Sequence, residues 1–400
     1  MSQLDSPTNT FTALLTPSGS AAIACLALHG PKAWQMVRSL FRPRSAGGSS
    51  LPEQPEVGSL WLGLLGDAAA DEVVITVKRV LPVPLVEVHC HGGREVVRML
   101  QEVFATRGAP SCSWQEFLRR TADNALQAAA AVCLADALTT RTAAILLDQH
   151  QGAFSKAVQC ILEHWQRGAT EDAAVSLREL KRLCFLGSHL TKPYRVVLAG
   201  AANVGKSSLA NALAGYERCI VTETPGTTRD VVTTLIALDG WPVEVADTAG
   251  LRAGGSDLEA QGMTLSRDAA SQADLCLWLL DASREPVWPD FQLERIRFVI
   301  NKIDLAPVWN LQEVTDATHV CARTGEGLQG LCETISRTLV PNSPEPGAAV
   351  PFTSRLCDAV DSAWQLQLAG EREKAWQALA NACVVPDNHL ERECHAAGQD

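Results

Sequence analysis

The stretch VVLAGAANVGKSSLANALAG, residues 196–215, constrains the fold of this chain more than any other feature. An apolar run ends at Gly200, and a segment with apolar residues at helical spacing begins after Gly205. This pattern predicts a buried strand, a glycine-rich turn and a helix. The turn has the spacing Gly200-x-x-x-x-Gly205-Lys206-Ser207, which is the pattern of a phosphate-binding loop. Other strands alternate with helical stretches as far as about residue 340, so the sequence predicts a doubly wound α/β domain.

Each residue type in this loop has a part in holding a phosphate. Glycines let the backbone N–H groups point inward at a helix N-terminus, where they bind an anion. Lys206 reaches the β- and γ-phosphates, and the Ser207 hydroxyl ligates Mg²⁺. An ordinary glycine-rich turn is the alternative, and the complete signature between a strand and a helix disfavours it. The loop residues predicted to bind the nucleotide are Gly200, Asn203, Val204, Gly205, Lys206, Ser207 and Ser208.

Two further apolar runs end in polar residues. The first is expected to contact Mg²⁺ and the γ-phosphate, and the second to read the base. The run VEVADTAG ends in Asp247, Thr248, Ala249 and Gly250. Asp247 is predicted to hold the Mg²⁺ through water, and the Gly250 N–H faces the γ-phosphate.

The run RFVINKID ends in Asn301, Lys302 and Asp304. A carboxylate at Asp304 accepts two N–H bonds from guanine, which adenine does not supply. Lys302 is expected along the base plane, and the Ala322 N–H, between Cys321 and Arg323, is expected at guanine O6. The three motifs in this order favour GTP, and a site for ATP is the weaker alternative.

The hydrolytic step lacks one familiar group. Leu251 follows the DTAG motif where many GTPases place a glutamine, and its apolar side chain cannot orient water. The loop TETPGTTRD, residues 222–230, offers Thr227 or Thr228 to Mg²⁺, and its carbonyls with the Asn203 side chain offer a site to a monovalent cation. Glu259 follows flexible glycines and is a second candidate, although by itself it is typical of a solvated carboxylate.

Composition places limits on the class of protein. Thirteen scattered cysteines without a CxxC pair indicate reduced thiols and a cytoplasmic location. No apolar run is long enough for a membrane span, and no secretory signal is expected. The formal net charge is −11, so contact with RNA would need a local basic patch.

The sequence resembles the MnmE (TrmE) family of tRNA-modifying GTPases. The segments NVGKSSLANALAG, IVTETPGTTRDVV and DTAGLR carry the resemblance, together with a DLE whose glutamate, Glu259, lies twelve residues beyond Asp247. Outside this region, TPSGSAAIACLALHG (residues 16–30), VEVHCHGGREVVRMLQEVF (residues 86–104) and HQGAFSKAVQCILEHW (residues 150–165) also resemble the family.

The resemblance implies an activity with its cofactors and partners. Asn203 and the backbone of Thr222, Thr224 and Thr227 would hold K⁺, Thr228 would close on Mg²⁺, and Glu259 would orient the attacking water. The catalytic residues are then Glu259, Lys206 and Thr228, and the Mg²⁺ ligands are Ser207, Thr228 and Asp247. The resemblance also implies a homodimer, a tetrahydrofolate derivative as a ligand, and an MnmG-type flavoprotein partner in wobble-uridine modification of tRNA.

The resemblance implies four segments. Residues 1–115 would form an α+β tetrahydrofolate-binding-like dimerisation domain. Residues 116–191 and 343–400 would form a discontinuous all-α helical domain, whose second part is shortened. Residues 192–342 would form a Ras-like P-loop G domain inserted between the helical parts.

Departures from the family keep a second hypothesis open. TPSGSAA stands where the family has TPPGRGG, and the segment ERECHAAGQD lacks the family's CIGK motif. These differences favour a GTP-dependent switch or assembly module derived from the family, without tRNA chemistry. The full-length layout favours the tRNA-modifying GTPase.

One further pattern lies outside these motifs. His89 and His91 flank Cys90, so on a strand both imidazoles share one face. A metal site is conceivable, but the sequence names no third ligand. A strand end leading into the turn at Gly92 and Gly93 is the favoured interpretation.

Overall fold

The chain divides into two compact units. The computed structural model describes residues 9–44, 50–122, 124–216, 232–247, 271–290 and 295–384. The units are Met1–Asn124 and Ala125–Asp400. Within the described ranges, every helix is too short or too polar to span a bilayer.

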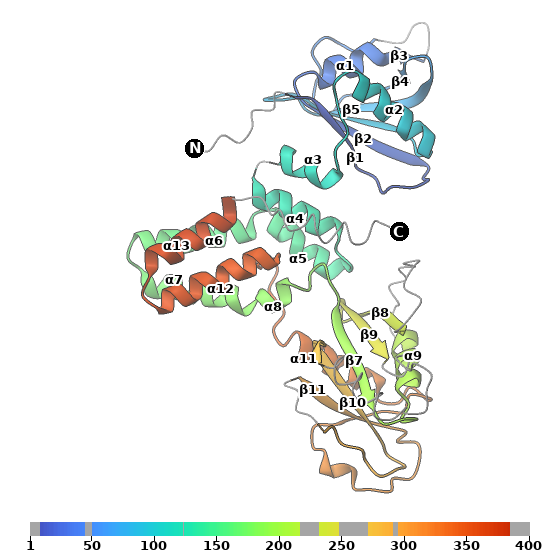
Figure 1. Cartoon of the computed structure of the whole chain (residues 1–400), viewed down its shortest axis with the longest axis vertical. Coiled ribbons are helices and arrows are strands. Elements are labelled where there is room, and N and C mark those ends of the chain that lie inside the picture. The colour runs from blue at the N-terminus through green and yellow to red at the C-terminus, as the bar shows by residue number, and fades with distance from the viewer. Residues whose placement is uncertain are drawn as a thin grey trace. The chain divides into compact units, whose positions relative to one another are not determined.

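The first unit is built on a six-stranded antiparallel sheet with the order β1-β2-β6-β5-β4-β3. Buried and more exposed residues alternate along β6, as expected for a strand that packs one face on a core. Val86, Val88 and Cys90 enter the core, and the residues between them face the other way. Helices α1 and α2 cover the core face (Figure 1). The elements are β1 (Phe11–Leu14), β2 (Ile23–His29), α1 (Ala33–Leu40), β3 (Phe41–Pro43), β4 (Leu60–Gly66), β5 (Ala70–Arg79), β6 (Leu85–His91), α2 (Arg94–Thr106) and α3 (Trp114–Thr121).

Helix α3 belongs to this first unit. The Ser113 side chain accepts a hydrogen bond from the Glu116 N–H and begins the helix. Phe117 is 2% exposed and meets Phe11 edge to face, with ring centroids 5.5 Å apart. The predicted boundary after residue 115 therefore differs from the structure, where the unit extends to Asn124. Helical composition alone did not show which core the apolar face of this helix joins.

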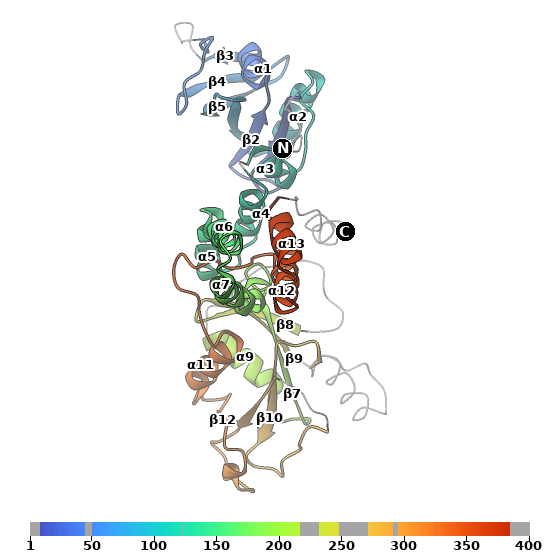
Figure 2. The same cartoon turned by 90° about the vertical axis from the view of Figure 1, so that its left-hand side faces the viewer.

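The helices of the second unit come from two distant stretches of the chain. Helix α12 packs against α7 and α13 packs against α6, so the returning chain completes the bundle (Figures 1 and 2). The Thr139 and Thr353 side chains cap α5 and α12. The helices are α4 (Ala125–Ala135), α5 (Thr140–His150), α6 (Ala153–Gln166), α7 (Thr170–Arg182), α8 (Cys184–Gly187), α12 (Ser354–Leu368) and α13 (Arg372–Val384).

The part of the chain between α8 and α12 forms a second six-stranded sheet with the order β12-β11-β10-β7-β9-β8. Strand β8 runs antiparallel to β9 and the other pairs are parallel. The predicted strand, loop and helix are confirmed as β7 and α9. The elements are β7 (Tyr194–Gly200), α9 (Lys206–Tyr216), β8 (Val232–Leu238), β9 (Trp241–Asp247), β10 (Leu275–Asp281), β11 (Ile296–Asn301), η2 (Leu311–Glu313), β12 (Thr318–His319) and α11 (Leu328–Leu339).

Both faces of this sheet are covered by apolar side chains. Val196 and Leu198 of β7 face α9 and α11 in a cluster that continues into the helical stretches. Trp278 and Leu280 of β10 face the opposite way and pack with residues of the segment 303–317. A strand buried on both faces reads as a continuous apolar run, which is why β7 and β10 show little alternation in the sequence.

The buried Gln149 side chain joins α5 to the returning chain and allows a test of this arrangement. Its Nε2 donates to the Ala348 carbonyl at 3.0 Å, and its Oε1 accepts from the Val350 N–H at 3.0 Å. Gln149→Leu removes the amide and leaves the Ala348 carbonyl and the Val350 N–H without these hydrogen bonds. We therefore expect the free energy of unfolding to fall by about 1–3 kcal/mol in thermal or urea denaturation. The exposed Gln159→Leu is the control, and equal losses in the two variants would contradict the role of Gln149.

Candidate nucleotide-binding site

The loop between β7 and α9 requires glycine at two positions. Gly200 has φ 131°, and a Cβ there would lie 2.5 Å from the Leu279 carbonyl oxygen. Gly205 has φ 102°, and a Cβ there would lie 2.3 Å from Asn301 Nδ2. Both conformations are strained for other residues, so the glycines are needed for the backbone path and for space. The loop is held close to the ends of β10 and β11.

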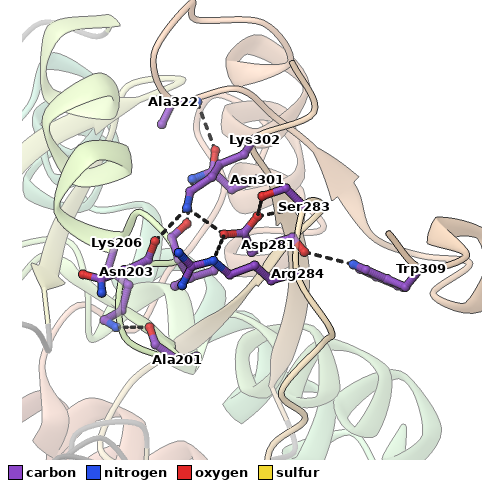
Figure 3. Close-up of polar contacts among 11 residues, drawn as sticks. Ala201, Asn203, Lys206, Asp281, Ser283, Arg284, Asn301, Lys302, Trp309 and Ala322 are labelled. Atoms are coloured by element: carbon purple, nitrogen blue, oxygen red, sulfur yellow. Dashed lines mark hydrogen bonds and ion pairs between the residues drawn. The ribbon is translucent and has the colours of Figure 1, made fainter. Parts of the chain in front are cut away.

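Lys206 lies folded over this loop. Its side chain is largely buried at 8% exposure, and its ammonium donates to the carbonyls of Gly200 at 2.9 Å and Ala201 at 2.8 Å (Figure 3). These contacts hold the positive charge against the loop, at the N-terminus of α9. A phosphate there would meet both the charge and the backbone N–H groups.

The two predicted magnesium ligands within the described residues lie together. The Ser207 hydroxyl donates to Asp247 Oδ2, although the two residues lie on different elements, α9 and β9. Asp247 is 6% exposed, because it ends a strand that is buried on both faces. A hydroxyl and a carboxylate oxygen are the ligands that Mg²⁺ prefers, so this pair fits the ion.

The Asn301 side chain connects three segments. Its Nδ2 donates to the Val204 carbonyl at 2.9 Å, and its Oδ1 accepts from the Ala322 N–H at 3.1 Å. It is 2% exposed, so both bonds are shielded from water. The Ala322 N–H was predicted to face guanine O6, and here it is bonded to Asn301 instead.

Asp281 is a member of this site that the sequence interpretation missed. It accepts from Lys302 Nζ at 2.6 Å and from the backbone N–H and hydroxyl of Ser283, at 2.9 and 2.7 Å (Figure 3). Lys302, whose φ is 62°, also donates to the Asn203 carbonyl at 2.8 Å. Burial opposes the charge on Asp281, but the bonds from Lys302 and Ser283 outweigh it and lower the pKa of that carboxyl. A signal existed, since LCLWLLD is an apolar strand ending in aspartate.

Asp304 lies in the turn after β11 and contacts the loop that carries Cys321. Its Oδ1 accepts from the Cys321 thiol at 3.0 Å, and its Oδ2 pairs with the Arg323 guanidinium. The Cys321 bond is the largest of the contributions that lower the pKa of this carboxyl. Arg323 is exposed, so its guanidinium is free to move aside for a base that donates to Asp304.

The structure thus brings together the loop residues, Asp247, and the segments at Asn301 and Cys321. Ser208 lies exposed on α9 and Val204 is buried below the loop. The other predicted site residues lie outside the described residues: Thr222, Thr224, Thr227, Thr228, Thr248, Ala249, Gly250 and Glu259.

This loop, with its lysine and serine and the NKID segment beside it, defines a P-loop GTPase domain. The family model described as 50S ribosome-binding GTPase matches residues 195–310. Across nearly the whole chain, the protein belongs to the MnmE family of tRNA modification GTPases.

Three relatives carry this assignment, and each bears the name tRNA modification GTPase MnmE. The protein of Nitratidesulfovibrio vulgaris (strain DP4) is 31% identical over 91% of this chain and 89% of its own. That of Thermotoga petrophila is 33% identical over 82% of each chain. That of Thermus thermophilus is 30% identical over 87% of this chain and 86% of its own.

Because Asp281 holds Lys302, we expect a substitution that breaks this contact to lower the affinity for guanine nucleotides. Asp281→Asn removes the charge that holds the Lys302 ammonium beside the Asn203 carbonyl, so we expect roughly tenfold weaker GDP binding. Isothermal titration calorimetry measures the change.

Glu285→Gln is the matched control, because this exposed carboxylate lies in the same loop. Unchanged affinity in Asp281→Asn, or an equal loss in the control, would show that Asp281 does not position the lysine.

Proposed function

We propose that this chain binds and hydrolyses GTP in the modification of the wobble uridine of tRNA. The observation that carries the proposal is the buried Asn301 side chain, which joins the phosphate loop to the segment that carries Ala322. This connection supports the proposal because Lys206, which would hold phosphates, follows the loop that contains Val204, and Asp304, which would read the base, bonds to Cys321 and Arg323 on either side of Ala322. Family membership supports the tRNA part of the proposal.

Each side chain would act on a different part of the nucleotide. Lys206 would exchange its bonds to the loop carbonyls for bonds to the β- and γ-phosphates, where it stabilises charge. Asp304 would accept the N–H groups of guanine, and Lys302, fixed by Asp281, would lie along the base. Ser207 and Asp247 would hold Mg²⁺, which neutralises the phosphate oxygens when bound.

Water attack would depend on residues beyond those the structure describes. Leu251 cannot orient water, so we assign that part to Glu259, with Thr228 closing on Mg²⁺. Asn203 has φ 62° and an exposed side chain, and would ligate K⁺ together with the backbone of Thr222, Thr224 and Thr227. The K⁺ would supply positive charge where other GTPases use arginine.

The remaining parts of the proposal rest on family membership. They are a homodimer, an MnmG-type flavoprotein partner, a tetrahydrofolate derivative bound by the first unit, and a cytoplasmic location. An N-terminal domain that extends to Asn124, a helical domain in two parts and an inserted G domain are proposed with these functions.

A second candidate function is a GTP-dependent switch or assembly module without tRNA chemistry. The segment TPSGSAA, residues 16–22, favours it, because an arginine and glycines of the family's TPPGRGG pattern are missing. In this case the bound nucleotide would set the geometry of the dimer, and no tRNA modification would follow.

The hydrolytic proposal predicts a dependence on the monovalent cation. We expect faster GTP turnover in K⁺ than in Na⁺ at equal ionic strength, measured by phosphate release. Glu259→Ala should lower kcat about 100-fold or more while GTP affinity is retained, because the carboxylate acts on water rather than on nucleotide.

Glu313→Ala, an exposed carboxylate of the same domain, is the control and should leave both quantities unchanged. Equal rates in the two salts would reject the cation site, and full activity of Glu259→Ala would reject its role.

The tRNA proposal predicts a chemical change in cells. A strain lacking the gene should lose the wobble-uridine modification, and mass spectrometry of its tRNA nucleosides measures the loss. The chain should restore the modification, whereas Lys206→Ala should not, because its phosphate contact is lost. Unchanged modification in the deletion strain would favour the switch.

A further inference from the structure

One face of the first sheet carries polar side chains that the nucleotide site does not use. Along β6, Glu87, His89 and His91 lie on the face opposite the core. His91 is engaged by Asp71, which accepts from its backbone N–H at 2.9 Å and lies 2.7 Å from its Nδ1. The two histidines of the sequence pattern therefore have different surroundings, and His91 is not part of a common site with His89.

His89 has two other neighbours that bind metals. The strand register places Cys25 of β2 directly opposite His89, and Glu87 precedes His89 by two residues on the same face. The thiol sulfur, a carboxylate oxygen and an imidazole nitrogen of this trio lie within 4.8 Å of one another. His89 Nε2 is 3.4 Å from Glu87 Oε2. In the part of the chain that the structure describes, no other trio of His, Cys, Asp or Glu has this geometry.

These distances suit a tetrahedral ion. Zinc bonds of about 2.0–2.3 Å place neighbouring ligand atoms about 3.3–3.8 Å apart. The imidazole and carboxylate already have this separation, and the thiol sulfur lies within 4.8 Å of both. A thiolate favours zinc over Mg²⁺ or Ca²⁺, which prefer oxygen ligands.

A cation at the trio would have to displace the proton of the Cys25 thiol, because burial, and with it the Glu87 carboxylate, raises the pKa of this thiol to about 12. A divalent cation would stabilise the thiolate and the carboxylate together. Lys78 competes for Glu87, but its Nζ lies 3.9 Å away and its side chain is 53% exposed, so it is free to move away.

We propose that Cys25, Glu87 and His89 form a Zn²⁺ site in the first unit. Three protein ligands leave one position of a tetrahedral ion for water or for a donor atom of a small molecule. The site is independent of the proposed GTPase function, because its ligands all belong to the first sheet and the nucleotide site belongs to the other unit.

Cobalt titration of the full chain tests the site, because Co²⁺ takes the place of zinc and its bond to a thiolate gives a charge-transfer band. The protein is reduced, freed of nucleotide and metal, and titrated with Co²⁺ and then with Zn²⁺. We expect the band to saturate at one equivalent and to disappear when Zn²⁺ displaces the cobalt.

Cys25→Ser should abolish the band. His89→Gln and Glu87→Gln should weaken metal binding at least about tenfold, the smallest loss expected when even a hydrogen-bond partner of a ligand is removed. His91→Gln is the control on the same strand. Cys160→Ser is the control for an exposed thiol, because Cys160 lies 3.7 Å from His164 and could bind metal adventitiously.

Two outcomes would overturn the proposal. One is a band that persists in Cys25→Ser, and the other is an equal loss in the two controls. Circular dichroism shows whether each variant is folded, and GDP affinity, set by the other unit, should stay unchanged in all of them. Metal binding without GDP binding would instead reject the GTPase proposal and leave this site intact.

Discussion

The carboxamide of Asn301 holds the nucleotide-binding segments in their relative positions. Its two hydrogen bonds reach Val204 in the phosphate loop and Ala322 in the loop after β12, and its burial keeps water from competing for either. The absence of a Cβ at Gly205 is what lets this amide approach so closely. Rotation of this one buried side chain would therefore break both hydrogen bonds that join the loop after β7 to the loop after β12.

Two lysine side chains add further hydrogen bonds to those of Asn301 within this site. Lys302 joins Asp281 to the Asn203 carbonyl, and Lys206 is held by two carbonyls of its own loop. These bonds hold both ammonium groups within the site, so their side chains have little conformational freedom left to lose. Asp304 differs, because the base proposed to bind this carboxylate would have to displace the exposed Arg323 that is paired with it.

The two units solve the same packing problem in different ways. In the antiparallel sheet of the first unit, β6 buries one face only, so it alternates and leaves Glu87 and His89 on the other face. The mostly parallel sheet of the second unit is covered on both faces, and the site residues Asp247, Asp281 and Asn301 are each the last residue of a strand. This difference explains why functional side chains lie at the ends of strands in one unit and along a strand in the other.

The sequence by itself determined the phosphate loop, the strands that end at Asp247 and Asn301, and the helical nature of the flanking stretches. These features depend on spacing over a few residues, where glycine conformation and apolar periodicity act locally. Only the tertiary structure decided that Asp281 holds Lys302, that Ala322 donates to Asn301, and that α3 packs with Phe11. It also decided that Cys25 lies opposite His89, because strand register joins residues that are distant in the chain and no local pattern specifies it.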